Sequence, residues 1–482
     1  MTGQFRFDNS YLRDLPGSYL AVRPAIPPQP RLLAFNAPLA QEMGLDVPAL
    51  TAEAAELLSG ARLPDGAEPI AQAYAGHQFG GFSSQLGDGR AVLLGEVIGP
   101  DGQRRDIQLK GSGRTPFSRS GDGKAAVGPM LREFLIGEAL HALQIPTTRA
   151  LAVVATGEPV WRNVELPGAV LARVAASHIR IGTFQFFAAR QDLDKLKALI
   201  DYTIARHHPA AAGTDNPALG LFDAVIGAQA RLIAQWMGVG FIHGVMNTDN
   251  MALSGESIDF GPCAFMDSYA PGTVFSSIDH GGRYAYANQP LILGWNLARL
   301  AECLLPFLDP DQNRAVDLAN DRLQGIEARY QAEWLAVMRR KLGLTTAQPG
   351  DAALAEGFLA AMEGQGVDWT LAFHRLAQAA EGDIVPLRAL FADPTALLAW
   401  LGGWQARLTP GSVALMRASN PRLIARNHLV EAALEAATAG DMAPFHALVD
   451  ALRRPFDPDP ALERFALAPP QGLAPHVTFC GT

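Results

Sequence analysis

The sequence predicts an α+β fold with two lobes: a small lobe rich in strands, then a larger helical lobe, with extensions at both ends. A chain of 482 residues is long for a single hydrophobic core, so two lobes or more are expected. Residues 105–110 alternate polar and apolar side chains, as a half-buried strand does. From Asn216 onwards, apolar residues recur at helical spacing.

The first half of the chain predicts two short helices over 38–43 and 51–58, the second capped by Thr51. Strands are expected over 91–97, 105–110, 151–154 and 168–174, with a helix over 127–143. A long core helix begins at Asn216-Pro217 and reaches Trp236. Further helices are expected over 294–305, 315–342, 369–380, 394–401, 421–437 and 443–452.

These elements divide the chain into four segments. Residues 1–70 form an extension that braces the lobes, and 71–175 form the small lobe. Residues 176–345 form the helical lobe, and 346–482 form a helical extension with a tail.

Two segments of the helical lobe suggest chemistry. Residues 242–250, followed by Asp259-Phe260-Gly261, resemble the paired loops in which kinase-like enzymes hold metal ligands and a base. Asn250 and Asp259 match the metal ligands, but the position of the usual base holds Val245, which cannot accept a proton. Asp249 is the candidate base; its alternative role is to support the metal site or cap the loop.

Two glycine turns precede these loops. Gly87 and Gly89 flank a turn whose backbone N–H groups can approach phosphate oxygens, and Arg90 adds charge. An ordinary hairpin turn is the alternative. Asp122 and Gly123 belong to a second turn, able to fold over a nucleotide.

Four charged residues complete the candidate site. Lys110 ends a strand and Glu133 lies in the following helix, as the phosphate-binding lysine of a kinase and its partner do. Solvated side chains are the alternative for both. Arg173 and Arg180 lie where the lobes should join; they can bind phosphate, or form ion pairs with helix carboxylates. The order of all these motifs predicts a protein-kinase-like fold.

The composition excludes other classes. With 39 basic and 48 acidic residues the net charge is −9, which argues against general nucleic-acid binding. We find no signal sequence and no run of about eighteen apolar residues, so no membrane association is expected. Three cysteines are too few for a disulfide framework or a zinc cluster. A cytoplasmic monomer is expected.

Four stretches of the sequence resemble the SelO/YdiU family of pseudokinase-like protein adenylyltransferases, and the resemblance covers nearly the whole chain. They are Tyr74-Ala75-Gly76-His77-Gln78-Phe79-Gly80, Gln108-Leu109-Lys110-Gly111-Ser112-Gly113-Arg114-Thr115-Pro116-Phe117-Ser118-Arg119, His243-Gly244-Val245-Met246-Asn247-Thr248-Asp249-Asn250, and residues 420–428 with Asn420-Pro421-Arg422 and Arg426-Asn427-His428.

The resemblance implies a function and a set of roles. It implies transfer of AMP from ATP to Ser, Thr or Tyr hydroxyls of proteins, with ATP flipped relative to ordinary kinases and Mg²⁺ or Mn²⁺ as cofactor. A redox connection of the substrates is left open. By this resemblance, Glu133 orients Lys110, Asn250 and Asp259 bind the metal ion, and Asp249 is the base. The residues that would contact the nucleotide are Gly87, Gly89, Arg90, Lys110, Asp122, Gly123, Arg173, Arg180 and Asp259.

Three other functions stay open at this stage. The enzyme could use UTP with Mn²⁺, or transfer the γ-phosphate of ATP as an ordinary kinase does. With Val245 at the usual base position, a nucleotide-binding scaffold without turnover is the third. The presence of Lys110, Glu133, Asn250 and Asp259 argues against the scaffold, which would not need two metal ligands.

The resemblance also suggests a redox switch. Many family members end in a tripeptide that contains cysteine or selenocysteine, and this chain ends Cys480-Gly481-Thr482. A reversible disulfide between Cys263 and Cys480 would tie the tail to the segment after Asp259. The alternative is an exposed, unpaired Cys480 together with a buried Cys263.

Overall fold

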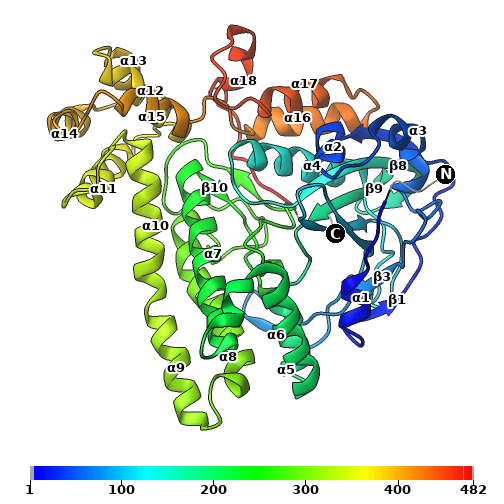
Figure 1. Ribbon diagram of the computed structural model, residues 1–482. Coiled ribbons are helices and arrows are strands. Elements are labelled where there is room, and N and C mark those ends of the chain that lie inside the picture. The colour runs from blue at the N-terminus through cyan, green and yellow to red at the C-terminus, as the bar shows by residue number, and fades with distance from the viewer. Residues whose placement is uncertain (1–4, 471, 480–482) are drawn as a thin grey trace.

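The computed structural model describes residues 5–470 and 472–479. Its main sheet has seven antiparallel strands (Figure 1). In spatial order they are β1 (Tyr19–Ala21), β3 (Ile70–Gln72), β6 (Ala91–Ile98), β7 (Arg104–Lys110), β9 (Glu165–Ala175), β8 (Arg149–Trp161) and β2 (Arg31–Phe35). The strands expected in the sequence are β6, β7, β8 and β9, which form the middle of this sheet. The chain is thus a mixed α and β protein.

Both faces of the sheet are buried. Successive side chains along its strands point to opposite faces, and each face packs in its own core. Leu93, Val153 and Leu171 pack in the core that includes α4 (Val127–Ala142). Their neighbours Leu94, Val154 and Val170 pack in a second core. That second core includes residues of α2 (Ala37–Glu42) and α3 (Val47–Leu57). A helix layer therefore covers each face, as a sheet with two apolar faces requires.

The N-terminal extension takes part in this sheet. Its strands β1 and β2 form the two edges, and its helices are α1 (Ser10–Asp14), α2 and α3. The expected start of α3 at Thr51 is wrong: the helix begins at Val47, with the side chain of Asp46 accepting a hydrogen bond from the N–H of Ala49. Thr51 lies inside the helix, where its hydroxyl donates to the carbonyl oxygen of Val47.

The middle of the chain is helical. It contains α5 (Ile181–Ala188), α6 (Leu193–His207), α7 (Pro217–Val239), α8 (Gln289–Leu308), α9 (Gln312–Gln324) and α10 (Ile326–Lys341), with short 3₁₀ turns at Pro209–Gly213, Thr248–Asn250 and Tyr286–Asn288. The side chain of Asn216 caps α7, as expected. A single helix over 315–342 was wrong, because Gly325 ends α9 and α10 starts after it.

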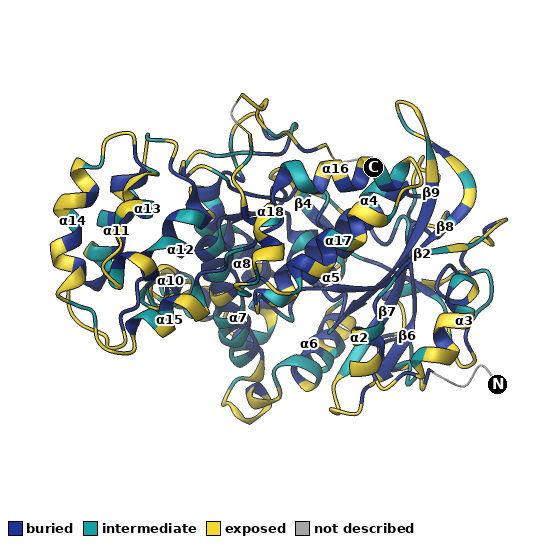
Figure 2. Ribbon diagram, turned by 90° about the horizontal axis from the view of Figure 1, so that it is seen from above, coloured by how far each residue is buried: buried dark blue, intermediate teal, exposed yellow. Residues whose placement is uncertain are grey.

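The last part of the chain returns to the sheet. Helices α11 (Asp351–Met362), α12 (Trp369–Ala380), α13 (Val385–Arg388), α14 (Thr395–Gln405) and α15 (Ser412–Ser419) lie at the end of the molecule away from the sheet (Figures 1 and 2). Helices α16 (Asn427–Thr438) and α17 (Ala443–Leu452) then pack beside α4 (Figure 1). A 3₁₀ turn (Pro460–Leu462) and α18 (Glu463–Ala466) follow.

The expected helix over 421–437 starts too early. Residues 421–426 are not helical, because the N–H groups of Arg422 and Leu423 both donate to the carbonyl oxygen of Pro455. Arg426 is buried there, with its guanidinium on Asp267 at 2.8 Å and on Asp368 at 2.7 Å. A buried arginine needs such partners, and the extended segment provides them.

Among the described residues, two helical segments are long and apolar enough to cross a membrane by length and composition alone. They are Pro217–Val239 and Tyr286–Leu308, with 61% and 50% of their apolar windows buried inside the protein. A buried core helix meets the same criteria, and the sequence predicts the first as a core helix.

Candidate active site

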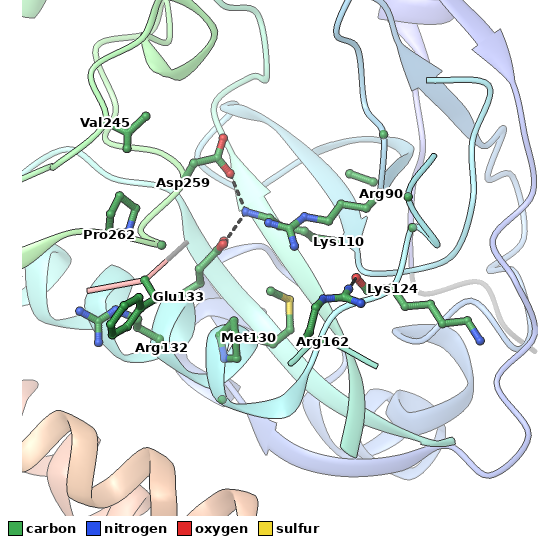
Figure 3. Close-up of a pocket in the computed structure, with 18 of the residues that line it drawn as sticks. Arg90, Lys110, Lys124, Met130, Arg132, Glu133, Arg162, Val245, Asp259 and Pro262 are labelled. Carbon is green, nitrogen blue, oxygen red and sulfur yellow. Dashed lines mark hydrogen bonds and ion pairs between the residues drawn. The ribbon is translucent and has the colours of Figure 1, made fainter. Parts of the chain in front are cut away.

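A cavity of about 1460 Å³ lies where the sheet meets the helical part of the chain (Figure 3). Every residue predicted to bind nucleotide or metal lines it, as do Glu133 and the proposed base Asp249. The nucleotide and metal set is Gly87, Gly89, Arg90, Lys110, Asp122, Gly123, Arg173, Arg180, Asn250 and Asp259. These residues are far apart in the sequence, so the fold brings the whole predicted set together.

Strand pairing explains why two of the cations face this cavity. In the register of β7 and β9, Gln108 lies opposite Arg173, and Lys110 is two residues further along β7. Residues two apart on a strand share a face. Lys110 and Arg173 therefore project from the same side of the sheet.

Lys110 forms two ion pairs. Its Nζ contacts the carboxylate of Glu133 on α4, and it lies 2.6 Å from Oδ1 of Asp259 (Figure 3). Lys110 and Glu133 are 6% and 5% exposed. The pairing expected of a kinase-like lysine and glutamate is therefore present, and solvated positions for the two are excluded.

Asp259 is held by three cations. Besides Lys110, Nη1 of Arg173 lies 2.7 Å from Oδ1, and Nη1 of Arg180 lies 2.8 Å from Oδ2. Burial alone would raise the pKa of Asp259, but Lys110, Arg173 and Arg180 hold it well below its usual range. Asp259 also has a positive φ of 65°, which is uncommon outside glycine and typical of strained functional positions.

The two arginines form ion pairs, and one of these is with a helix carboxylate, the alternative that the sequence offered: Nη1 of Arg173 lies 3.8 Å from Oε2 of Glu133 on α4. Both pair with Asp259, which lies in a loop. Such a cluster of cations around one carboxylate can also receive phosphate groups, since guanidinium groups bind either anion.

A second layer of polar residues behind Arg173 was not predicted. Nη2 of Arg173 donates to Oε1 of Gln108 at 2.6 Å, and Nε2 of Gln108 donates to Oδ2 of Asp88 at 3.1 Å. Burial raises the pKa of Asp88 to about 6. Gln108 is two residues from Lys110 on the same strand, so the sequence indicated that the two side chains share a face. The layer orients Arg173 towards the cavity.

The first glycine turn needs its glycine. Gly87 has a φ of 72°, and a Cβ there would lie 2.3 Å from the ring of Phe117. Arg90 extends towards Lys110 (Figure 3).

The second glycine turn lies at the rim of the cavity, where Oδ2 of Asp122 accepts a hydrogen bond from Arg162 at 2.9 Å. Arg162 was not predicted and lines the cavity as well.

The 243–250 loop presents Asp249 to the cavity. Nε2 of His243 lies 2.8 Å from the carbonyl oxygen of Ile258, which ties this loop to the segment before Asp259. Asp249 is 7% exposed; its Oδ2 accepts a hydrogen bond from Gln78, and its buried Oδ1 has no partner among the described residues. Burial raises the pKa of Asp249 to about 6, against the opposing effects of Gln78 and Arg180. A carboxylate with a pKa of about 6 is suited to accept a proton near neutral pH.

A divalent cation fits this site only together with a ligand. Within the described residues, no group of three or more His, Cys, Asp or Glu could hold a metal ion. Nδ2 of Asn250 donates to the carbonyl oxygen of Val245 at 3.0 Å, so its amide oxygen is the atom that can meet a cation beside Asp259. Mg²⁺ is commonly bound by one or two such protein ligands plus substrate phosphates. The residues present fit that mode of binding.

Only one cysteine of the predicted redox pair can be described, because Cys480 lies outside the described residues. Cys263 is fully buried, and its thiol donates to the carbonyl oxygen of Phe260 at 3.2 Å. Burial raises the pKa of the Cys263 thiol to about 12. The disulfide stays a prediction.

Comparison with known proteins places the chain among the nucleotidyltransferases. A protein of Cereibacter sphaeroides named Protein nucleotidyltransferase YdiU is 63% identical over 480 residues, covering 99% of this chain and 100% of that protein. Proteins of the same name from Chromobacterium violaceum and Methylorubrum populi are 58% and 56% identical, covering 97% and 100% of this chain and 100% of each relative. The family model described as Protein adenylyltransferase SelO matches residues 4–453. The chain belongs to the SelO family and is an enzyme of the nucleotidyltransferase class.

Proposed function

We propose that this enzyme transfers AMP from ATP to Ser, Thr or Tyr hydroxyls of proteins, itself included, and releases pyrophosphate. The observation that carries the proposal is the convergence of Lys110, Arg173 and Arg180 on one point of the cavity. Arg173 and Arg180 are only 2% and 3% exposed. Buried cations of this kind need an anionic ligand or partner.

The position of these cations supports a flipped nucleotide. We propose that the sheet with α4 and the helical part are the two lobes of a kinase-like fold, joined at the cavity. In an ordinary kinase the innermost part of the cleft receives neutral adenine, which needs no cationic partners. In this enzyme we propose that the two buried arginines beside Asp259 hold the β- and γ-phosphates, which leaves the α-phosphate towards the acceptor.

The proposed reaction uses Asp249 as the base. The hydroxyl oxygen of the acceptor attacks the α-phosphorus, its proton passes to the carboxylate of Asp249, and the bond from the α-phosphorus to the bridging oxygen of pyrophosphate breaks. Lys110, Arg173 and Arg180 stabilise the charge on the leaving pyrophosphate. Asn250 and Asp259 would hold Mg²⁺ or Mn²⁺, which supplies further charge neutralisation when bound.

Intact mass spectrometry after incubation with ATP and Mg²⁺ tests the proposal, with Asp259→Ala as the comparison. A gain of one AMP unit by the wild-type protein, absent in the variant, is expected. A gain of one phosphate would make the enzyme a kinase, and a gain of UMP only from UTP with Mn²⁺ would change the substrate. If the protein binds ATP but neither it nor an added protein acceptor gains mass, it is a nucleotide-binding scaffold without turnover.

A further inference from the structure

The stretch Tyr74–Gly80 forms part of a hairpin to which the proposed reaction gives no role. Strands β4 (Gly76–Gln78) and β5 (Gly81–Ser83) are joined by Phe79 and Gly80. Both linking residues have positive φ, 49° for Phe79 and 87° for Gly80. A bulky residue such as phenylalanine rarely adopts this conformation, and such strain is concentrated at functional sites.

Three hydrogen bonds fasten this hairpin to the 243–250 loop. The backbone N–H of His77 donates to Oγ1 of Thr248 at 2.7 Å, and the backbone N–H of Phe79 donates to Oδ1 of Asn247 at 3.1 Å. Between them, Nε2 of Gln78 donates to Oδ2 of Asp249 at 3.0 Å. Three consecutive residues of the hairpin thus bind three consecutive residues of the loop.

The approach of the hairpin to Asp249 is close. A Cβ on Gly76 would lie 2.9 Å from Oδ1 of Asp249 and 3.1 Å from its Cβ, so the chain can pass here only as glycine. Because Gln78 occupies Oδ2, the unpaired oxygen of the carboxylate is Oδ1. The hairpin therefore contacts both oxygens of Asp249: Gln78 binds Oδ2, and Gly76 packs against Oδ1.

Apolar side chains also line the cavity. Phe79, Val245 and Ile278 are among them, and Phe79, next to Gln78 in the hairpin, is 40% exposed. The ring of Phe79 packs edge-on against Tyr284 with 5.2 Å between centroids, and the hydroxyl of Tyr284 donates to Asn247 at 2.6 Å. Exposed apolar groups held rigidly beside a reactive carboxylate indicate a surface that binds a partner.

We propose that the β4–β5 hairpin is the acceptor-recognition element of this enzyme. Gln78 is a positioning residue that orients Asp249. Phe79 contacts an apolar side chain next to the acceptor hydroxyl of the polypeptide substrate. The inference rests on the proposed AMP transfer, and it adds the side of the site that meets the protein substrate.

The experiment measures AMP transfer to two synthetic peptides, each with one serine, flanked by leucines in one and by glycines in the other. The wild-type enzyme is expected to use the leucine peptide with a KM about tenfold lower. Phe79→Ala should abolish this preference and leave the KM for ATP unchanged. The control Leu398→Ala removes an exposed leucine on α14, at the far end of the molecule from the sheet (Figure 2), and should change nothing.

The role of Gln78 is read from kcat. Gln78→Leu should lower kcat by about tenfold to a hundredfold with both KM values unchanged, because the base is misplaced while binding is intact. Gln405→Leu, an exposed glutamine on α14, is the control. Thermal shifts with ATP check that each variant is folded.

Each alternative outcome has its own meaning. No AMP transfer by the wild-type enzyme, to the peptides or to itself, would overturn the proposed function and the inference with it. Transfer by the wild-type enzyme without preference for the leucine peptide would overturn the inference alone. An unchanged kcat in Gln78→Leu, or a preference retained in Phe79→Ala, would overturn it as well.

Discussion

Nη1 of Arg180 lies 2.8 Å from Oδ2 of Asp259, and the same atom donates to the backbone carbonyl oxygen of Asp249 at 2.6 Å. One guanidinium group thus connects the proposed metal ligand with the proposed base. It is also stacked over the ring of Tyr74, 4.7 Å from the centroid. Arg180 sets the distance between the two loops that form the reactive side of the cavity.

Arg180→Lys is expected to lower kcat/KM by at least about tenfold, although the charge is retained. An ammonium group lacks the planar fork that lets arginine meet several acceptors in a fixed geometry. Steady-state kinetics and ATP titration by calorimetry measure the effect. The control Arg190→Lys changes an exposed arginine that stacks on Phe186, and should leave the kinetics as they are. Wild-type kinetics in Arg180→Lys would contradict the bridging role.

Asp249→Asn should lower kcat by about 10²- to 10⁴-fold, the usual contribution of a general base. The amide has nearly the same shape as the carboxylate but cannot accept the hydroxyl proton. Binding of ATP, measured by calorimetry, should be retained because Lys110, Arg173 and Arg180 are untouched. A loss of ATP affinity with an unchanged kcat would assign Asp249 to nucleotide binding instead.

Arg426→Ala is expected to destabilise the fold by about 3–5 kcal/mol, because it leaves Asp267 and Asp368 beside a buried gap without their cation. Chemical unfolding followed by circular dichroism measures the difference. Arg417→Ala is the control: its pair with Glu381 is exposed, and such pairs contribute about 1 kcal/mol or less. Equal effects of the two substitutions would refute a structural role for the buried pair.

Lys341 gives the stability a pH dependence. It is 3% exposed, its Nζ lies 4.1 Å from the ring centroid of Phe373, and burial lowers the pKa of Lys341 to about 7. The unfolded chain keeps the ordinary pKa of about 10.4, so between these values it binds a proton that the folded protein does not. The cost of burying Lys341 is therefore complete below about pH 7 and disappears as the pH rises towards about 10.4.

Lys341→Met should consequently raise the Tm, with the largest gain near neutral pH and a smaller one near pH ~10. Thermal unfolding at both pH values measures this. Lys197→Met, at an exposed lysine of α6, should show no such trend. A gain in Tm for Lys341→Met that is equal at both pH values would contradict the buried, neutral lysine.

Which residues would line the cavity was more predictable than some of the element boundaries, and the reasons are physical. Lys110, Glu133, Asn250 and Asp259 are recognisable because their chemistry demands particular residue types at particular spacings. The start of α16 at Asn427 was not predictable in this way. It depends on hydrogen bonds from the preceding segment to the carbonyl oxygen of Pro455 and on the burial of Arg426. Contacts between distant segments override the local helical pattern there.

The same distinction holds within the site. The pairing of Arg173 with Gln108 follows from strand register, which the sequence does not specify until the partner strand is known. The contact of Gln78 with Asp249 joins two motifs that are separate in the sequence. The strand alternation of 105–110 indicated which side chains share a face, but not what they would meet.

The proposed AMP transfer requires that the α-phosphate of ATP, and not the γ-phosphate, reaches the acceptor. The most direct measurement is to incubate the enzyme and a protein acceptor with ATP that carries radioactive phosphorus at either the α- or the γ-phosphate, and to count the label on the protein. AMP transfer is expected to label the protein only from α-labelled ATP, with the γ-label released in pyrophosphate. Label from γ-labelled ATP alone would contradict it and identify an ordinary kinase.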